Sequence, residues 1–269
     1  KDAVAFEELK GSDKYLLVRL NQVIQAVREA YDRYNFMEVY RTIFNFLTND
    51  LSAFYLDFAK DIVYIETANS TERRRMQTVM YAILVKLTKL LVPIIPHTAE
   101  EIWTYLEQEE EAYAYLTEMP SAELIPDAAE MLDFWSAFLE FRTSVHKALE
   151  MARDEKVIGK SLEASVTVYP DEATRVLLAS VAETENVATL LIVSEFIVSH
   201  QAAPENAVKV GDTALTVAHA SGEVCQRCRR IDETVGTNAH PHLAEFCDHC
   251  ASIVAAEFPD AVAEGFEVK

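Results

Sequence analysis

The chain has 269 residues, half of them apolar and a quarter charged, with a formal net charge of -20 at pH 7. This composition is that of a folded globular protein, and it excludes a disordered chain. No apolar run approaches the length of a membrane helix, and the first 15 residues lack the apolar segment of a signal peptide. We therefore expect a cytoplasmic protein without membrane contact. Because residue 1 is Lys rather than Met, we also expect a piece of a longer chain.

The first part of the chain predicts an antiparallel bundle of amphipathic helices. Apolar residues recur at helical spacing over residues 13–35, 36–48, 50–60 and 69–92, and another helix opens near residue 98. Short connections between such helices favour antiparallel packing. The expected N-caps are Ser12, Asn69 with Glu72, and Thr98 with Glu101. In the second helix, one stripe is expected to face the core, and it consists of Phe36, Val39, Tyr40, Ile43 and Leu47.

The pattern changes after about residue 135. A helix over residues 134–155 is followed by strict alternation from Ala164 to Val168, which is typical of a strand. Two β-branched runs, TLLIVSEFIVS and TALTVAHAS, predict further strands, with a helix over residues 171–183. The fold class is therefore mainly α. The expected domains are a helical bundle (1–135), a small α+β junction domain (136–221) and a cysteine-bearing domain (222–269).

The four cysteines form two CxxC pairs, Cys225 with Cys228 and Cys247 with Cys250. In each pair, a tight turn can aim both sulfurs at one point, and the gap between the pairs fits a four-thiolate zinc site. Such a closed site predicts one structural zinc ion without a catalytic role. A disulfide framework is the alternative, and His240 or His242 could replace a cysteine. A redox-active pair would need a thioredoxin-like setting, which the pattern does not predict.

Positive charge gathers in three places of this acidic chain. Residues 73–99 contain no Asp or Glu, residues 142–161 carry five basic and three acidic residues, and CQRCRR packs three arginines around two cysteines. Because salt screens exposed charges beyond about 8 Å, such clusters can bind an anion despite the net charge. They are either anion-binding surfaces or ordinary solvated helix faces. We find no GxGxxG, GxxxxGKS, HExxH or GxSxG motif, so the sequence predicts a binding module and no catalytic residues.

Two segments, YRTIFNFLTNDLSAFYLDFAKDIVY and RRRMQTVMYAILVKLTKLLVPIIPHTAEEIW, resemble the helical anticodon-binding domain of class I aminoacyl-tRNA synthetases. Three later stretches, VHKALEMARDEKVIGKSLEASVTVYP, CQRCRR and FCDHC, are similar to the C-terminal region of bacterial-type isoleucyl-tRNA synthetases. Enzymes of this family join isoleucine to its tRNA using ATP. Their His-Ile-Gly-His and Lys-Met-Ser-Lys-Ser signatures are absent from this chain. The resemblance therefore implies that catalysis, editing and ATP binding belong to the upstream part of a parent chain.

The resemblance also implies the partners, which are the anticodon arm of isoleucine tRNA and the upstream catalytic domain of the same chain, in a monomer. Arginine suits this task because it forks onto phosphate and stacks on an unpaired base. The residues expected to contact tRNA are Arg227, Arg229, Arg230, Arg73, Arg74, Arg75, Arg142, Lys147 and Arg153. Alternatively, the three arginines of CQRCRR form ion pairs with Asp232, Glu233, Glu245 or Asp248. The competing function is a zinc-stapled helical scaffold that binds protein instead of RNA.

Overall fold

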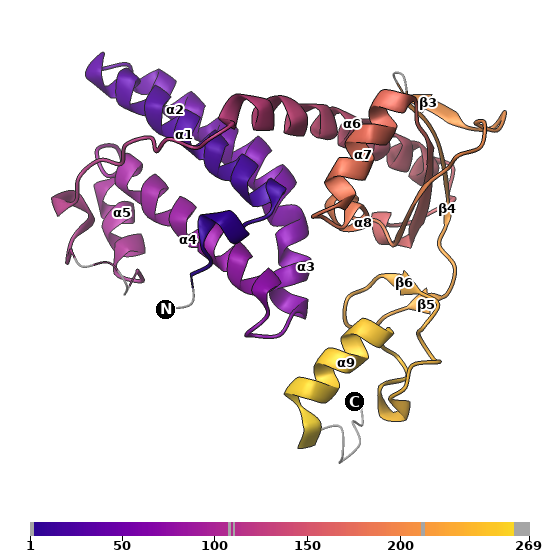
Figure 1. Ribbon diagram of the computed structural model, residues 1–269. Helices are drawn as coiled ribbons and strands as arrows, with labels where there is room; N and C mark the ends of the chain where they lie inside the picture. The colour runs from indigo at the N-terminus through magenta and orange to yellow at the C-terminus, as the bar shows by residue number, and fades with distance from the viewer. Residues whose placement is uncertain (1–2, 107–108, 110, 211–212, 261–269) are drawn as a thin grey trace. The chain divides into compact units, whose positions relative to one another are not determined.

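The computed structural model describes residues 3–106, 109, 111–210 and 213–260. The chain forms two compact units, of which the first comprises Lys1–Val63 and Asn69–Leu132 and the second Tyr64–Ala68 and Asp133–Lys269. Helices dominate, which confirms the mainly α fold class (Figure 1). Among the described residues, no helix combines the length and apolar character needed to cross a bilayer. The division of residues 136–269 into a junction domain and a zinc domain stays a prediction.

The first unit is built from helices. They are the 3₁₀ helix η1 (Phe6–Glu8), α1 (Gly11–Asp32), α2 (Phe36–Asn45), the π-helix η2 (Phe46–Leu56), α3 (Asp57–Ile65, up to Val63), α4 (Thr71–Leu91), α5 (Pro96–Trp103) and the 3₁₀ helix η3 (Ala114–Leu116). The long helix α1 contacts α2, η2 and α4. Most of its predicted apolar stripe is buried, since Leu16, Leu20, Ile24 and Val27 are fully covered, whereas Tyr34 at the end of the predicted helix lies beyond α1 and is 80% exposed. This stripe forms the centre of the core.

The second and third predicted helices form one continuous helical run, from Phe36 to Ile65. No Gly or Pro interrupts this stretch, so the chain passes through the wider π turn of η2 instead of breaking. The predicted core stripe is only half right. Val39 and Ile43 are buried, whereas Phe36 and Tyr40 are 51% and 57% exposed. The helix therefore carries apolar residues on a second face as well.

The starts of three helices differ from the predicted caps. Ser70, not Asn69, caps α4, because its hydroxyl accepts a hydrogen bond from the N–H of the third helical residue. Helix α1 begins one residue before the predicted cap Ser12, which is buried in the first turn. Helix α5 begins at Pro96, ahead of Thr98, because proline is suited to the first helical position.

A buried ion cluster joins three helices of the first unit. Asp13 of α1 is fully buried and accepts a hydrogen bond from Arg75 Nη1 of α4 at 2.6 Å. The hydroxyl of Tyr55, also fully buried, donates to the other carboxylate oxygen at 2.6 Å. Glu72 approaches the same guanidinium at 2.9 Å and the Lys10 ammonium at 2.8 Å. Both charges of the central pair are thus compensated inside the core.

The second unit contains the sheet and the cysteine-bearing segment. Its elements are α6 (Ala128–Asp154, from Asp133 on), the 3₁₀ helix η4 (Ser161–Glu163), β1 (Ala164–Tyr169), α7 (Glu172–Ala182), α8 (Val187–Leu191), β2 (Glu195–Val198), β3 (Val208–Val210), β4 (Thr213–His219), β5 (Glu223–Val224), β6 (Ile231–Asp232), the 3₁₀ helix η5 (Pro241–Leu243) and α9 (Asp248–Glu257). One sheet has the strand order β2-β1-β4-β3, and β5 pairs with β6. Among the strand pairs of the described residues, β1 and β2 run parallel and the other pairs are antiparallel.

The register of the four-stranded sheet places apolar residues opposite one another. Val166 of β1 faces Phe196 of β2 on one side and Val217 of β4 on the other. The buried positions of β1 alternate as the sequence predicts. Helix α6 packs against this sheet through Phe141, whose ring meets that of Phe196 edge-on at 6.1 Å. This aromatic contact joins the helix to the sheet within the second unit.

The predicted strand over residues 189–199 is wrong in its first half. Residues Val187–Leu191 form the short helix α8, and β2 starts at Glu195. The side chain of Asn186 caps the helix by accepting from the N–H of Thr189 at 3.0 Å. Ile192 then ends the helix in a left-handed conformation, with φ of 57°. A capping residue thus overrides the strand preference of a β-branched run.

Candidate metal centre and nucleic-acid interface

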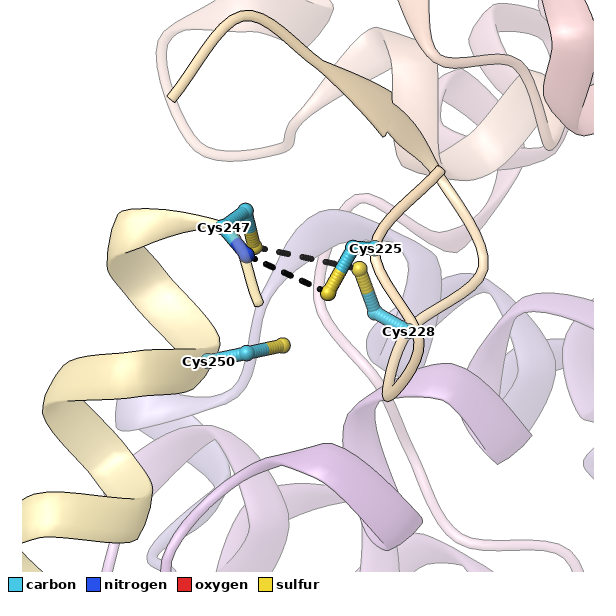
Figure 2. Close-up of side chains that lie close together, drawn as sticks. All are labelled: Cys225, Cys228, Cys247 and Cys250. Atoms are coloured by element: carbon cyan, nitrogen blue, oxygen red, sulfur yellow. Dashed lines mark hydrogen bonds between the residues drawn. The ribbon is translucent and has the colours of Figure 1, made fainter. Parts of the chain in front are cut away.

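The four cysteines meet at one point, although 18 residues separate the two pairs. Cys225 and Cys228 lie on the turn between β5 and β6, which we call the zinc knuckle turn (residues 225–230). Cys247 is the N-cap of α9, and Cys250 lies in the first turn of that helix. Figure 2 shows the four side chains converging from the turn and from the helix start. Because a helix N-terminus favours negative charge, this position suits thiolates.

The spacing of the sulfurs fits one zinc ion. All four Sγ atoms lie within 4.8 Å of one another, and Cys228 Sγ is 3.9 Å from Cys247 Sγ. Zn–S bonds of about 2.3 Å in a tetrahedron place two sulfurs about 3.8 Å apart. The cysteines are free thiols, so the disulfide alternative is wrong. Among the described residues, the metal-ligand cluster contains these cysteines and neither His240 nor His242.

The proximity of the thiols perturbs their proton affinities. Hydrogen bonds from Cys228 and Cys250 lower the pKa of Cys225 far below its usual range. The hydrogen bond to Cys225 in turn raises the pKa of Cys228 to about 12, and that of Cys250 is also raised. One of the cysteines therefore loses its proton easily, whereas a second or third thiolate would be repelled by the negative charge of the first. A divalent cation removes this repulsion, which is the electrostatic reason for the site to take up a metal.

Backbone hydrogen bonds fix the zinc knuckle turn. The N–H of Cys225 donates to the carbonyl of Arg230 at 2.8 Å, and the N–H of Arg229 donates to the carbonyl of Cys225 at 2.9 Å. Gly222, with φ of +109°, brings the chain close to β6, and a Cβ there would lie 2.5 Å from the backbone of Asp232. The sequence analysis missed this glycine. Its position three residues before a CxxC pair is the signal that could have found it.

Of the three knuckle arginines, Arg229 is the one exposed to solvent, whereas Arg227 and Arg230 are half-buried. Arg227 donates to the carbonyl of Ile65, which belongs to the same unit, and lies 3.7 Å from the Cys250 sulfur. Arg230 donates to the hydroxyl of Thr189 at 2.9 Å. The acceptors of these hydrogen bonds are neutral oxygens and a cysteine sulfur. Arg227 and Arg230 are therefore held by neutral partners and not by the four nearby carboxylates.

The backbone of Arg229 is in the left-handed region, with φ of 66°. This conformation costs a non-glycine residue roughly 1–2 kcal/mol. The backbone hydrogen bonds that close the turn impose this conformation. The guanidinium of Arg229 is exposed and donates a hydrogen bond to the side chain of Gln226 at 2.8 Å. Strain of this kind gathers at functional sites. The turn thus presents one arginine outward.

Two of the other predicted tRNA contacts are not at the surface. Arg75 is 2% exposed and pairs with Asp13 in the core, and Arg142 is 8% exposed and donates to the carbonyl of Leu190. The structure does not support their expected contact with RNA, because both guanidinium groups are buried and hydrogen-bond to partners in the core. Arg73 and Arg74 are half-buried, whereas Lys147 and Arg153 on α6 are exposed.

Segment 73–99 contains no acidic residue, but carboxylates from another part of the chain lie beside two of its lysines. Lys86 pairs with Glu123, and Lys89 lies 3.8 Å from Glu109, so carboxylates from the following loop neutralise the far end of α4. The partners are separated by 37 and 20 residues, which sequence patterning does not reveal. Carboxylates of the first unit therefore offset the two lysines of α4.

One residue that anchors the zinc knuckle turn has no sequence signature. The hydroxyl of Ser194 donates to the carbonyl of Leu162 at 2.5 Å and accepts from the N–H of Ile231 at 2.8 Å. It thus ties β6 to η4, the 3₁₀ helix that precedes β1. A serine between two β-branched runs is common in any sheet, so only the tertiary structure assigns it this role.

Comparison with known proteins agrees with this geometry. A family model described as the anticodon-binding domain of tRNA ligase matches residues 13–168, and a zinc finger found in FPG and IleRS matches residues 222–253. The chain is 60% identical to an isoleucine–tRNA ligase of Lactococcus lactis over 99% of its length, and 57% identical to one of Streptococcus sanguinis. It spans 29% and 28% of those two proteins and matches their C-terminal part.

Proposed function

The chain belongs to the family of tRNA ligase anticodon-binding domains, and we propose that it binds the anticodon arm of isoleucine tRNA as the C-terminal part of an isoleucine–tRNA ligase. The observation that carries this proposal is the succession of two family matches along one chain, the helical domain first and the zinc finger after it. The high identity to isoleucine–tRNA ligases supports the choice of tRNA.

In the proposed mechanism, the chain orients tRNA and reads its anticodon bases. We assign Cys225, Cys228, Cys247 and Cys250 as the ligands of one zinc ion, which holds the turn rigid without taking part in a reaction. Arg229, held outward by this turn, contacts a phosphate or stacks on an unpaired base. The exposed Lys147 and Arg153 hold the RNA backbone, and the half-buried Arg73 and Arg74 can contribute at the start of α4. Arg227 and Arg230 position the turn.

The remaining steps belong to the parent ligase. The activation of isoleucine with ATP and its transfer to tRNA need residues that lie outside this chain, so we assign the chain no catalytic residue and no ATP site. We place the parent in the cytoplasm, because its substrate tRNA is a cytoplasmic molecule, and we propose that it acts as a monomer. The protein-binding scaffold, the competing hypothesis from the sequence, predicts that tRNA does not bind.

Titration of the chain with isoleucine tRNA and with a non-cognate tRNA tests the proposal. We expect tighter binding of isoleucine tRNA and an affinity that falls with salt, by about 0.7–0.9 in log-log slope per phosphate contact. Equal affinity for both tRNAs, or no binding at 50 mM salt, would contradict the proposal. Arg229→Gln should weaken isoleucine tRNA by roughly 1–3 kcal/mol if the side chain stacks on a base.

Two control variants separate reading from positioning. Lys147→Gln with Arg153→Gln should weaken both tRNAs to a similar extent and flatten the salt dependence, because phosphate contacts carry no sequence information. Arg33→Gln changes one charge of an exposed arginine in the first unit, where it pairs with Glu38, and should leave both affinities unchanged. If Arg229→Gln behaves like Arg33→Gln, the zinc knuckle turn is not an RNA contact.

A further inference from the structure

One face of α2 and of the turn before it bears large apolar side chains that remain exposed. We call it the α2 aromatic face, and it consists of Tyr34, Phe36, Met37, Tyr40 and Phe44. Their exposed fractions range from 49% for Phe44 to 80% for Tyr34. Tyr40 and Phe44 are stacked with ring centroids 5.5 Å apart, and Tyr34 meets Phe36 edge-on at 6.5 Å. Since Phe36 and Tyr40 are one helical turn apart, the surface is continuous.

The size of this face is that of the largest apolar patch on a typical folded protein, and such a patch is often functional. An aromatic side chain buries about 150–250 Å² when it is covered, so five half-exposed residues leave on the order of 500 Å² of apolar surface. Patches of that size on a folded protein generally mark an interaction site. Single exposed residues elsewhere, such as Tyr64 or Leu124, need no such explanation.

The apolar surface of α2 is wide, and the bundle covers only part of it. Val39, Ile43 and Phe46 are buried on the side that packs within the bundle. The α2 aromatic face lies next to these buried residues, and the polar side of the helix is formed by Glu38, Arg41, Thr42 and Asn45. Tyr40 and Phe44, at a spacing of four residues, form a ridge of the kind that fits the groove of another helix. The missing cover is therefore best supplied by a second helical layer.

The charges beside this face favour a protein over RNA. Residues 29–45 contain three carboxylates, Glu29, Asp32 and Glu38, and only two arginines. Arg33 donates to both carboxylate oxygens of Glu38, at 3.3 and 3.1 Å, which neutralises one of the two. A surface that holds a phosphate backbone needs an excess of positive charge. This stretch has an excess of negative charge.

We propose that an amphipathic helix from the remainder of the parent ligase packs on the α2 aromatic face and completes the bundle. The chain spans less than a third of the length of its relatives, so most of the parent is available to supply this helix. The inference rests on the proposed function, because it requires a parent chain of that kind. Its occupant is a segment with a continuous apolar stripe, covalently linked to the chain and therefore present at high local concentration.

Thiol labelling of single cysteine variants tests this proposal. Tyr40→Cys and Phe44→Cys place a thiol on the α2 aromatic face, in the 269-residue chain and in the full-length parent. The rate of maleimide modification at each site is followed by peptide mass spectrometry. Val176→Cys on α7, where the native residue is 56% exposed, shows the rate of an open site in the chain. We expect both face variants to react like Val176→Cys in the chain and at least tenfold more slowly in the parent.

Three outcomes would overturn the proposal. Equal labelling rates in chain and parent would show that nothing covers the face. Protection of the chain by added isoleucine tRNA would make the face an RNA surface. Protection that grows with chain concentration would make it a contact between two copies. Labelling of the parent is measured without tRNA, so a chain that fails to bind tRNA disproves the proposed function and leaves this test intact.

Discussion

Replacement of Arg75 by Met should destabilise the first unit strongly. The substitution removes the guanidinium that donates to Asp13 at 2.6 Å, and it leaves a fully buried carboxylate with the hydroxyl of Tyr55 and the N–H of Lys10 as hydrogen-bond donors. Loss of one partner of a buried ion pair costs about 3–5 kcal/mol. Glu72 adds little to this loss, because its side chain is 39% exposed. At about 2–4 °C per kcal/mol, the melting temperature should fall by on the order of 10 °C.

Urea denaturation followed by tryptophan fluorescence measures the effect. The chain has two tryptophans, the buried Trp103 in the first unit and the buried Trp135 in the second. In a Trp135→Phe background, the signal reports the first unit alone. Arg41→Met serves as the matched control, because this arginine is exposed on α2 and its loss should change the free energy of unfolding by about 0.5 kcal/mol or less.

A double variant distinguishes an uncompensated charge from lost packing. Asp13→Leu together with Arg75→Met removes both charges, and it should recover most of the stability that the single Arg75→Met variant loses. The folded fraction of Arg75→Met should also bind tRNA like the unsubstituted 269-residue chain, because this side chain does not reach the surface. The reasoning is refuted if Arg75→Met costs less than 1 kcal/mol, or if the double variant is as unstable as the single one.

Three further predictions concern the metal, the turn and the response to acid. Elemental analysis should find one zinc ion per chain, and a chain without zinc would contradict the site. Cys228→Ser should abolish zinc binding and loosen residues 222–260, while the urea midpoint of the first unit stays the same. In the presence of a chelator, Gly222→Ala should lose zinc far more readily than Gly236→Ala. Both glycines have positive φ, but of the two, a Cβ at residue 222 would overlap neighbouring backbone. Equal zinc loss in the two variants would exclude this steric explanation. Burial raises the pKa of Glu72, but the hydrogen bonds and charges of Lys10 and Arg75 outweigh this effect and lower the pKa overall. The stability that Glu72 contributes is therefore present above its unfolded pKa near 4.5 and is lost as the pH falls. The acid unfolding curve of the first unit should be flatter in Glu72→Gln, and an unchanged curve would contradict this assignment.

The sequence by itself determined those features whose information is local. Two cysteines three residues apart meet in any tight turn, so the CxxC pairs predicted the thiol cluster before any tertiary contact was known. Apolar residues at a spacing of three and four residues predicted α1 and its buried stripe, because a helix places them on one face. The family resemblance was equally accessible, since it rests on contiguous segments.

Local patterns were misleading where two interpretations had similar energies. A run such as TLLIV suits a strand or a short buried helix, and the cap from Asn186 decided for α8. Periodicity likewise placed Phe36 and Tyr40 on an apolar face of α2, but it contains no information on whether anything covers that face. Exposure depends on neighbouring segments, and these can lie outside the chain.

The tertiary structure decided which charges are available to a ligand. Asp13 and Arg75 are 62 residues apart, so a cluster of three consecutive arginines looked like an anion-binding surface although one of them is a buried core residue. The backbone of the zinc knuckle turn likewise singled out Arg229, because closing the turn leaves Arg227 and Arg230 with partners inside the unit. Coulomb interactions depend on distance in space, and burial multiplies their strength, so the role of a charged residue follows from the fold and not from its neighbours in the sequence.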